Sequence, residues 1–529
     1  MVTGSAIARF GGFRQTRVWA CPERVAPVLI AVLLGWWSLR GFRGGSIAGA
    51  DPPRHAMNGA FILDMVRNWK VGHPVQYGYW YYGHFPALSL PFHPPLFPAF
   101  EALVFSVFGV GTFGARLAVS IATTVAALLM FRLVSKTHGS HLLAFVVTTS
   151  FFTLSTAQEL SSLVMLEIPA LVFVLASLLF IVPEQDMFAS LRSLGFGILA
   201  AMAIWTKQVV FLLPLPFIYA GLGRNWKVLR QTFFWLNICV PVASALGLAI
   251  LARQLNWNGI SQEWTRRGLL QGFVYNSHFY LSQGWLGLVL VTICLISYRL
   301  PGGRDGFRKD RLYIAWLAAS LLVLIGAPVY DLRYMFFAIP PFMLLFYHGL
   351  VRLGRYVGRS SHRVIPVAVC LVSVVYGLTT SRVRNLEGPS EAAMFLHNNG
   401  YRRLLYCGET NLAFIFGLRS NDPSLSSIVI RGDKLPDGIY LSEKLNAFIS
   451  QYGIEAVVLE HTNQSHPWDS LSPEVLPFLS LQRVVPVIDS TNENSGSLLL
   501  YRVLKPSKVP SNSLKVPITV LGRDVELRF

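Results

Sequence analysis

The sequence predicts a polytopic α-helical membrane protein with about eleven transmembrane helices, a large first outer loop with interfacial helices, and a C-terminal soluble α/β domain. Its 529 residues are 53% hydrophobic and 14% charged, and the mean hydropathy is +0.48. Soluble proteins carry about 25% charged residues. Apolar runs that can cross about 30 Å of hydrocarbon recur as far as residue 380. Basic residues gather between these runs.

The transmembrane helices are expected where the apolar runs lie. These runs are 25–42, 115–134, 141–158, 168–183, 193–206, 208–222, 231–252, 284–299, 311–328, 334–350 and 363–380. All the basic clusters fall on one side of the membrane if the N-terminus is cytoplasmic. We therefore expect an inner-membrane (cell-membrane) protein with a cytoplasmic N-terminus and a periplasmic C-terminal domain. The first run lacks a small-residue cleavage site and is expected to remain as a signal anchor.

Two domains are expected. Residues 1–380 form the membrane module, in which 40–114 is the first outer loop and 96–113 lies in the outer interface as an amphipathic helix. Residues 381–529 form the outer α/β domain with an irregular C-terminal tail. Its strand-like runs are 404–407, 427–430, 456–459 and 498–504, and its helical patterns are 390–398 and 441–452.

Composition and motifs exclude several classes of function. The 45 Lys and Arg against 27 Asp and Glu give a net charge of +18, but they form no single basic face, so nucleic acid is not an expected partner. The five cysteines are too scattered for a disulfide framework. The α/β region has no glycine-rich phosphate loop in a strand-turn-helix context, so no nucleotide site is expected there.

The first outer loop contains a candidate catalytic carboxylate. Asp51 precedes Pro52 and Pro53 at the start of a helical pattern. Asp at such a position often caps a helix, and this interpretation competes with a functional one. In the functional interpretation, Asp51 lies at the membrane boundary and takes a proton from an acceptor hydroxyl or amine. Arg54 beside it is suited to bind a phosphate.

A second carboxylate and a lysine occur at the ends of other apolar runs. Glu167 precedes Ile168 and Pro169, where it either stabilises a helix dipole or belongs to a functional site. Lys207 lies between two apolar runs with almost no loop, where it either reaches the membrane surface or meets an anion such as a lipid-borne phosphate.

Further candidates lie on the same predicted side of the membrane. Arg333, followed by Tyr334, either contacts lipid headgroups or grips a phosphate. Arg266 and Arg267 are also candidates, although Glu263 and Arg267 have the spacing of a helical ion pair. The aromatic run from Tyr77 to Tyr82 favours interface anchors over a ligand cage.

The histidines give little support for a metal. His55, His73, His84 and His93 lack the spacing of a helical metal site, and no cysteine joins them. We therefore predict no metal site, no cofactor and activity that is insensitive to chelators.

Six short segments occur in an order and spacing typical of one superfamily. They are 51–56 (Asp-Pro-Pro-Arg-His-Ala), 93–96 (His-Pro-Pro-Leu), 108–109 followed by 115–117, 165–169 (Met-Leu-Glu-Ile-Pro), 206–207 (Thr-Lys) and 333–334 (Arg-Tyr). Together they resemble the C-type (GT-C) glycosyltransferase superfamily. The resemblance is to the branch of glycosyltransferase family 39 that holds protein O-mannosyltransferases and bacterial lipid A aminoarabinose transferases, and it covers roughly residues 25–345.

The sequence departs from this family pattern in three places. The usual acidic pair of the first loop is reduced to Asp51 followed by Pro52, and the acid of the second loop, often Asp, is Glu167. His93 stands where some relatives have Lys.

The resemblance implies an inverting transfer of a hexose or pentose from a polyprenyl-phosphate carrier to a lipid, glycan or protein acceptor on the outer face. On this basis, Asp51 is the expected general base, while Glu167 orients the acceptor or Asp51. The donor phosphate would be bound by Arg54, Lys207, Arg333 and His93. The expected partners are this donor, membrane lipids and an unknown acceptor.

Two other functions stay open at the level of the sequence. A transporter or flippase of lipid-linked sugars would also have many spans and basic phosphate pockets, but such proteins often show an internal duplication, which is not evident here. A catalytically degenerate relative could instead act as a binding scaffold through its outer domain.

Overall fold

The computed structural model describes most of the chain. The described residues are 22–39, 45–90, 93–181, 191–254, 295–300, 303–326, 332–358, 360–380, 384–435, 442–462, 477–490, 496–504, 514–518 and 523–527, together with Thr292, Tyr440 and Trp468. The candidate residues Arg266 and Arg267 lie outside them, as does most of the predicted run 284–299.

Helices dominate the chain up to Thr380. They are α1 (Pro22–Leu39), α2 (Asp51–Arg67), α3 (Pro74–His84), α4 (Leu96–Phe108), α5 (Thr112–His138), α6 (His141–Thr153), α7 (Ser155–Ser162), α8 (Glu167–Ile181), α9 (Leu194–Thr206), α10 (Leu215–Leu222), α11 (Thr232–Gln254), α13 (Gly303–Gly326), α14 (Ile339–Val357) and α15 (Ser361–Thr380). The 3-10 helices are η3 (Leu191–Ser193), η4 (Val210–Leu212), η5 (Trp226–Arg230) and η6 (Leu332–Ala338).

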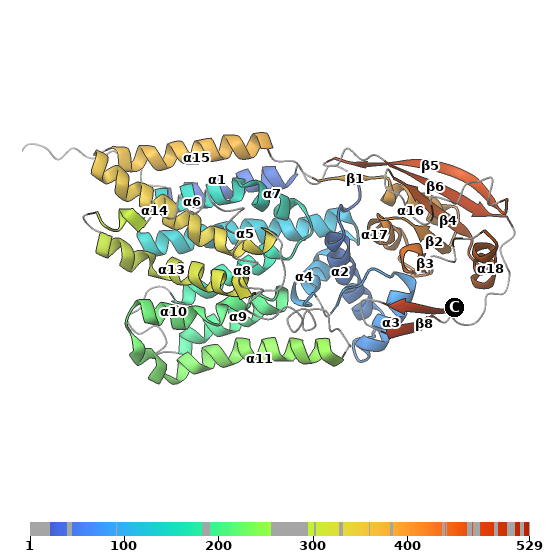
Figure 1. The fold of residues 1–529 in the computed structure, drawn as a ribbon, viewed down its shortest axis with the longest axis horizontal. Helices are drawn as coiled ribbons and strands as arrows, with labels where there is room; N and C mark the ends of the chain where they lie inside the picture. The colour runs from blue at the N-terminus through green and yellow to red at the C-terminus, as the bar shows by residue number, and fades with distance from the viewer. Residues whose placement is uncertain are drawn as a thin grey trace, which may run out of the picture.

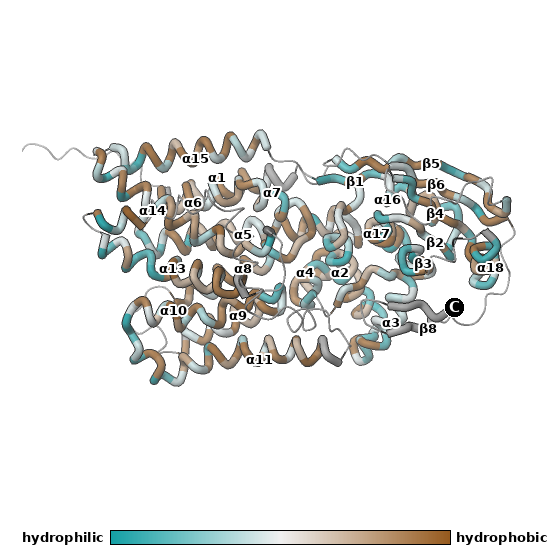
Figure 2. Tube along the Cα trace, in the orientation of Figure 1, coloured by the Kyte–Doolittle hydropathy of each residue, from teal (hydrophilic) through white to brown (hydrophobic). Residues whose placement is uncertain are grey.

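Most of these helices form an elongated bundle, whereas α2, α3 and α4 gather at one end of it beside the C-terminal strands (Figure 1). We call this end of the bundle the sheet end. Apolar residues prevail along the bundle helices (Figure 2). At the opposite end, α14 ends and α15 begins, with Arg352 and Arg355 in the last turns of α14 and Arg363 in the first turn of α15. The side of the membrane on which this end lies stays a prediction.

Fewer helices than predicted are long and apolar enough to span a membrane. Among the described residues there are four: Thr112–His138, Thr232–Leu251, Arg333–Val357 and Ser361–Thr380. The pair α7 and α8, bent by 109° at its break, adds a fifth if it is counted as one span. The other apolar helices are shorter, so the structure supports a polytopic membrane bundle without confirming eleven spans.

Helix α4 differs from the amphipathic interface helix that we predicted. It packs against α2 and α5, and Glu101, its one charged residue, is fully buried while Leu103 and Val107 are exposed. A Cβ on Gly59 of α2 would lie 2.7 Å from the Glu101 Cβ, so a residue without a side chain is needed where these helices cross.

The C-terminal region forms a mixed sheet with flanking helices. Its strands are β1 (Leu386–Glu387), β2 (Arg403–Cys407), β3 (Ile428–Arg431), β4 (Ala456–His461), β5 (Leu479–Asp489) and β6 (Gly496–Val503), in the order β1-β5-β6-β4-β2-β3. Strand β2 pairs in parallel with β3 and β4, and the other pairs are antiparallel. The helices are α16 (Pro389–Asn398), α17 (Asn411–Asn421) and α18 (Ser442–Tyr452), and the 3-10 helix η7 (Gly432–Lys434) follows β3.

Each predicted strand-like and helical pattern of this region coincides with a strand or helix of the structure. The C-terminal tail differs from the prediction: β7 (Leu514–Ile518) and β8 (Arg523–Leu527) pair antiparallel in what we expected to be irregular chain.

The C-terminal region shares its core with the helices at the sheet end. One hydrophobic cluster runs from the bundle through Phe105 of α4 to Phe416 of α17. The chain before α2 also joins the region, since Ser46 bridges to Leu386 and a Cβ on Gly45 would lie 2.4 Å from the Leu386 carbonyl oxygen. The predicted boundary at residue 381 therefore crosses a continuous core, and independent folding of the two parts stays a prediction.

A buried ion pair holds α17 against α2. The Arg419 guanidinium donates hydrogen bonds to both carboxylate oxygens of Asp64, at 2.5 and 2.8 Å, and the Tyr81 hydroxyl donates to the same carboxylate at 2.9 Å. The two charged side chains are only 3% and 4% exposed. The C-terminal region is thus fixed to the helix whose first residue is Asp51.

Candidate active site

Helix α2 presents Asp51 at the sheet end of the bundle. The helix begins at Asp51 because prolines occupy its first turn, where their missing N–H groups are not needed. The residue before it, Ala50, is the N-cap, and no side chain caps the helix, so the capping interpretation of Asp51 is wrong. Its carboxylate instead accepts hydrogen bonds from Arg333 at 2.9 Å and from Arg54 at 3.5 Å.

These neighbours keep Asp51 ionised. Burial would raise the pKa of this carboxyl, but the hydrogen bond and charge of Arg333, aided by the charge of Arg54, hold the pKa below its ordinary value of 3.8. Asp51 in the free protein is therefore an anion across the physiological range, and a weak base while Arg333 binds it.

Glu167 and Lys207 form a second ion pair. Glu167 is the first residue of α8, after the sharp bend that follows α7, and it is fully buried. One carboxylate oxygen accepts a hydrogen bond from Lys207, which follows the last residue of α9, while the other has no hydrogen-bond partner among the described residues. Lys207 therefore meets an anion, as one of the two sequence interpretations expected.

Tyr334 links the two pairs. The Lys207 ammonium lies 5.1 Å from the centre of the Tyr334 ring, and the Arg333 guanidinium lies 5.4 Å from it. The residues Glu167, Lys207, Tyr334, Arg333, Asp51 and Arg54 thus form a continuous series of contacts, which we call the charge chain. Its three cations and two carboxylates leave one net positive charge.

Two of the predicted histidines adjoin the charge chain but are neutral. The rings of His55 and His93 lie 4.2 Å apart. Burial and the surrounding cations lower the pKa of His55 well below its ordinary value, and burial lowers that of His93 to about 3 despite the opposing charge of Asp51. His93 therefore offers a phosphate a hydrogen bond, not a positive charge.

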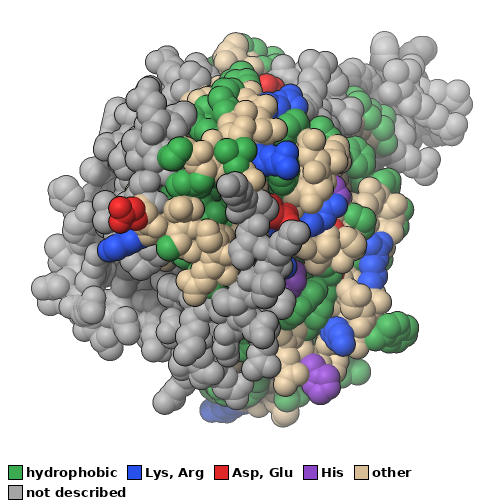
Figure 3. Space-filling model, turned by 90° about the vertical axis from the view of Figure 1, so that its right-hand side faces the viewer, with side chains coloured by type: hydrophobic (Ala, Val, Ile, Leu, Met, Phe, Trp, Pro, Cys, Tyr) green, Lys and Arg blue, Asp and Glu red, His purple; other side chains and the backbone are tan. Residues whose placement is uncertain are grey.

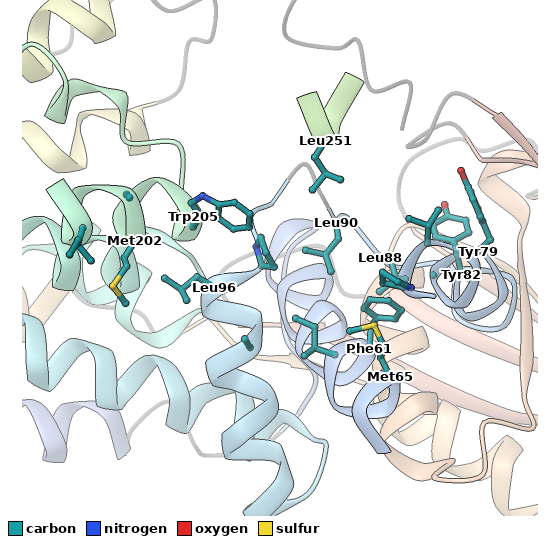
Figure 4. Close-up of a pocket in the computed structure, with 18 of the residues that line it drawn as sticks. Phe61, Met65, Tyr79, Tyr82, Leu88, Leu90, Leu96, Met202, Trp205 and Leu251 are labelled. Carbon is teal, nitrogen blue, oxygen red and sulfur yellow. The ribbon is translucent and has the colours of Figure 1, made fainter. Parts of the chain in front are cut away.

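An apolar cavity of about 620 Å³ lies beside the charge chain. Phe61 and Met65 of α2 and Tyr82 of α3 lie on one side, and Met202 and Trp205 of α9 lie on the other (Figure 4). Its further lining comes from α4, α11 and the segment 88–90. Trp205 stands two residues before Lys207, so α9 contributes to the cavity close to the point in the sequence where the charge chain begins.

The aromatic run of α3 has a different role from the predicted membrane anchors. Tyr77, Tyr81 and Tyr82 are buried, and Tyr77 and Tyr81 pack against Phe61. Burial raises the pKa of Tyr77 to about 12, so its hydroxyl remains protonated. Of the five aromatic residues from Tyr77 to Tyr82, only Trp80 is exposed. The prediction that these residues anchor the protein at the membrane interface is therefore wrong for the three buried tyrosines.

The sequence interpretation missed residues that support the site. Asn58 exchanges hydrogen bonds with Ser89, at 3.0 Å in both directions, and the Ser89 hydroxyl lies 3.2 Å from Nδ1 of His93. Arg431, the last residue of β3, binds Asp433 with two hydrogen bonds and donates a third to the carbonyl of Pro86, just after α3. The Arg-Gly-Asp sequence after a predicted parallel strand was the available signal, since ligands often bind at such strand ends.

A separate polar cluster lies at the opposite end of the bundle. There, Asp310 of α13 accepts hydrogen bonds from His138 (2.9 Å), His348 (2.7 Å), Tyr298 (2.5 Å) and Arg352 (2.8 Å). The ligand atoms of His138, Asp310 and His348 lie within 4.8 Å of one another, an arrangement that could also hold a metal ion. This cluster joins the ends of α5, α13 and α14 and has no contact with the charge chain among the described residues.

The described surface at the sheet end carries both signs of charge. Acidic, basic and histidine side chains are interspersed there with hydrophobic ones (Figure 3).

Comparisons with known proteins agree with this architecture. Residues 92–257 match the family described as dolichyl-phosphate-mannose-protein mannosyltransferase. No curated protein sequence matches the chain. Among solved structures, the chain is similar to apo ArnT from Cupriavidus metallidurans, with a TM-score of 0.58 and 15% identity over 93% of this chain and 99% of that one.

Two further structures are more distant. The Archaeoglobus fulgidus oligosaccharyltransferase has a TM-score of 0.49 and 12% identity, over 82% of this chain and 68% of its own. The S. cerevisiae protein O-mannosyltransferase complex Pmt1-Pmt2 has a TM-score of 0.31 and 16% identity, over 44% and 33%. The family model thus matches 166 of the 529 residues, and the similarity to ArnT extends a shared fold over most of the chain.

Proposed function

We propose that the protein is a membrane glycosyltransferase that moves a sugar from a polyprenyl-phosphate donor to an acceptor hydroxyl or amine, with inversion at the anomeric carbon. The sheet end would face away from the cytoplasm. The observation that carries the proposal is a net-positive charge chain near an apolar cavity, since α2 contributes residues to both and Trp205 of the cavity is two residues before Lys207 of the charge chain. A polyprenyl phosphate has the same two parts, an anionic head and a long apolar tail.

The matched family supports this choice of donor, because its description names dolichyl phosphate, itself a polyprenyl phosphate. In our proposal the isoprenoid chain occupies the cavity between α2, α3, α4, α9 and α11, and the phosphate lies against Arg54, Lys207 and Arg333.

The reaction needs one base and charge stabilisation at the leaving group. The acceptor oxygen or nitrogen attacks the anomeric carbon, and the bond from that carbon to the phosphate oxygen breaks. The electron pair leaves with the phosphate, and the acceptor proton passes to Asp51. The polyprenyl phosphate gains negative charge as it leaves, which the cations of the charge chain offset.

Donor binding would also prepare the base. In the free protein, Arg333 and Arg54 lower the basicity of Asp51 by binding it directly. A phosphate that draws these guanidiniums toward itself weakens both contacts, and the pKa of Asp51 rises. In the proposal, the second carboxylate oxygen of Glu167, which has no hydrogen-bond partner among the described residues, accepts a hydrogen bond from the acceptor.

The test is transfer of radiolabelled sugar from polyprenyl phosphates by the purified full-length protein in liposomes, with membrane extracts as acceptors. We expect Asp51→Asn to lose roughly 10²- to 10⁴-fold in kcat. Glu443→Gln, an acid-to-amide change at an exposed position of α18 remote from the bundle, is the matched control (Figure 1).

Three results would contradict the proposal. Full activity in Asp51→Asn would remove it as the base. Donor binding by the wild type without turnover would favour a scaffold. Movement of intact donor across the liposome membrane, again without turnover, would favour a flippase.

A further inference from the structure

One face of α2 meets the segment that follows α3. Asp51, His55 and Asn58 are spaced i, i+4 and i+7, so they share one side of the helix. Ser89 is hydrogen-bonded to Asn58. The ring of His93 packs against that of His55, with the ring centres 4.2 Å apart. The backbone N–H of His93 donates to the Ser89 carbonyl at 3.1 Å, which closes a turn between them.

Hydrogen bonds fix the orientation of the Asn58 amide. Its oxygen accepts from the backbone N–H of Ser89 at 3.0 Å, and a backbone N–H can only donate. The amide nitrogen must therefore face the Ser89 hydroxyl oxygen, to which it donates at 3.0 Å. Both residues are at most 2% exposed, so these hydrogen bonds are made inside the protein.

This orientation determines where the Ser89 hydroxyl directs its proton. The hydroxyl oxygen accepts from Asn58, and its other hydrogen-bond partner among the described residues is Nδ1 of His93, at 3.2 Å. A buried hydroxyl proton without an acceptor is costly, so the hydroxyl donates to Nδ1, which must then be unprotonated. Burial lowers the pKa of His93 to about 3, so the ring is neutral and carries its proton on Nε2.

The protonated nitrogen lies on the side of the ring away from Ser89. Nδ1 and Nε2 point to opposite sides of an imidazole, so Nε2 points away from the Asn58–Ser89 pair. His55, against which the ring packs, is one helical turn nearer Asp51 than Asn58 is. The ring of His93 therefore lies between this pair and the charge chain along the shared face of α2.

We propose that Asn58 and Ser89 are positioning residues: they hold His93 in the tautomer with the proton on Nε2, and this N–H donates a hydrogen bond to the phosphate of the polyprenyl-phosphate substrate. The inference rests on the proposed function and adds an uncharged hydrogen-bond donor to the three cations of its phosphate site. An uncharged group leaves the net charge beside Asp51 as it is, so it binds phosphate without weakening the base further.

The first test inverts the tautomer with one nearly isosteric change. In Asn58→Asp both side-chain oxygens accept, so one of them takes the Ser89 hydroxyl proton, and the hydroxyl oxygen then accepts from Nδ1–H of His93. ¹⁵N NMR of the detergent-solubilised full chain, labelled at its histidine rings, shows which nitrogen carries the proton, and His93→Ala assigns the signal. We expect Nε2–H in the wild type and Nδ1–H in Asn58→Asp at about pH 8, where the new carboxylate is ionised. A wild-type proton on Nδ1, or the same tautomer in both proteins, overturns the inference.

The second test measures binding of polyprenyl phosphate by calorimetry, which requires no turnover. We expect Asn58→Asp to weaken binding about tenfold while His93 is present, as the loss of one hydrogen bond would. In the His93→Ala background the same change should weaken binding much less, since no ring proton can be misplaced. Equal losses in the two backgrounds would reveal a structural or purely electrostatic effect and overturn the inference.

The matched control is Asn398→Asp, the same exchange at an exposed position of α16, which should change neither readout. The two tests also separate this inference from the proposed function. A wild type that binds no polyprenyl phosphate would overturn the proposed function and, with it, the phosphate role of His93. The NMR result would still decide whether Asn58 and Ser89 set the tautomer.

Discussion

Replacement of Arg419 by methionine tests how the C-terminal region is held on the catalytic helix. In the wild type, two hydrogen bonds of 2.5 and 2.8 Å join Arg419 to Asp64, and both side chains are almost fully buried. Methionine keeps much of the apolar packing but leaves Asp64 as a buried anion with only the Tyr81 hydroxyl and no opposite charge. Breaking such a pair costs about 3–5 kcal/mol.

This cost should appear as local opening between α2 and α17. At about 1.4 kcal/mol for each factor of ten, the opened population rises roughly 10²- to 4 × 10³-fold. Limited proteolysis of the full-length protein in detergent measures this population when closing is fast relative to cleavage. Transfer activity should fall as well, because α2 carries Asp51 at its first residue.

The matched control is the double variant Asp64→Asn/Arg419→Met, which removes both charges. We expect it to open less readily than Arg419→Met, and the difference measures the cost of the unpaired carboxylate. Wild-type cleavage rates in Arg419→Met would refute the reasoning. If the double variant opens as readily as Arg419→Met, the opening is caused by the loss of the Arg419 guanidinium contacts and not by the unpaired carboxylate of Asp64.

Two further predictions concern Glu101 and metal ions. Burial raises the pKa of Glu101 well above its ordinary value of 4.5, so the folded state binds the proton more tightly than the unfolded state does. The stability that this protonation provides is fully present below about pH 4.5, and it is lost as the pH rises through the pKa of the folded state. Glu101→Gln should therefore raise the apparent melting temperature at about pH 8 and leave it nearly unchanged at about pH 4.5; an equal shift at both would contradict the assignment. The carboxylates of Asp51 and Glu167 are already bound to cations, so EDTA should leave turnover unchanged, and a loss that zinc or magnesium restores would contradict this prediction.

The sequence predicted much of the local structure because periodicity and chain breaks are local signals. The helix that starts at Asp51 follows from Pro52 and Pro53, and the strand that ends at Arg431 follows from its apolar run. The orientation of α4 could not be predicted in this way. In a soluble protein, a charged residue such as Glu101 lies on the solvent-exposed side of its helix. In α4 the exposed side is apolar and Glu101 is buried, as is common where a helix faces lipid.

The sequence indicated several residues of the candidate site, but it did not indicate which of them bind one another. The sequence indicated Asp51, Glu167, Lys207 and Arg333 from their places at the ends of apolar runs. It could not indicate that Asp51 binds Arg333, 282 residues away, because that contact depends on how the helices pack. The same limit hid Arg431, which seemed to belong to a separate domain.

The polar cluster around Asp310 has a consequence for how the protein enters the membrane. Asp310 lies in α13 and Arg352 in α14, and each is costly in lipid without the other. The two helices follow one another in the chain, so until α14 emerges from the ribosome Asp310 has only His138 of α5 and Tyr298 as partners and lacks the permanent positive charge of Arg352. Insertion of α13 should therefore wait for α14, and the insertion machinery would release the two helices into the bilayer as a pair.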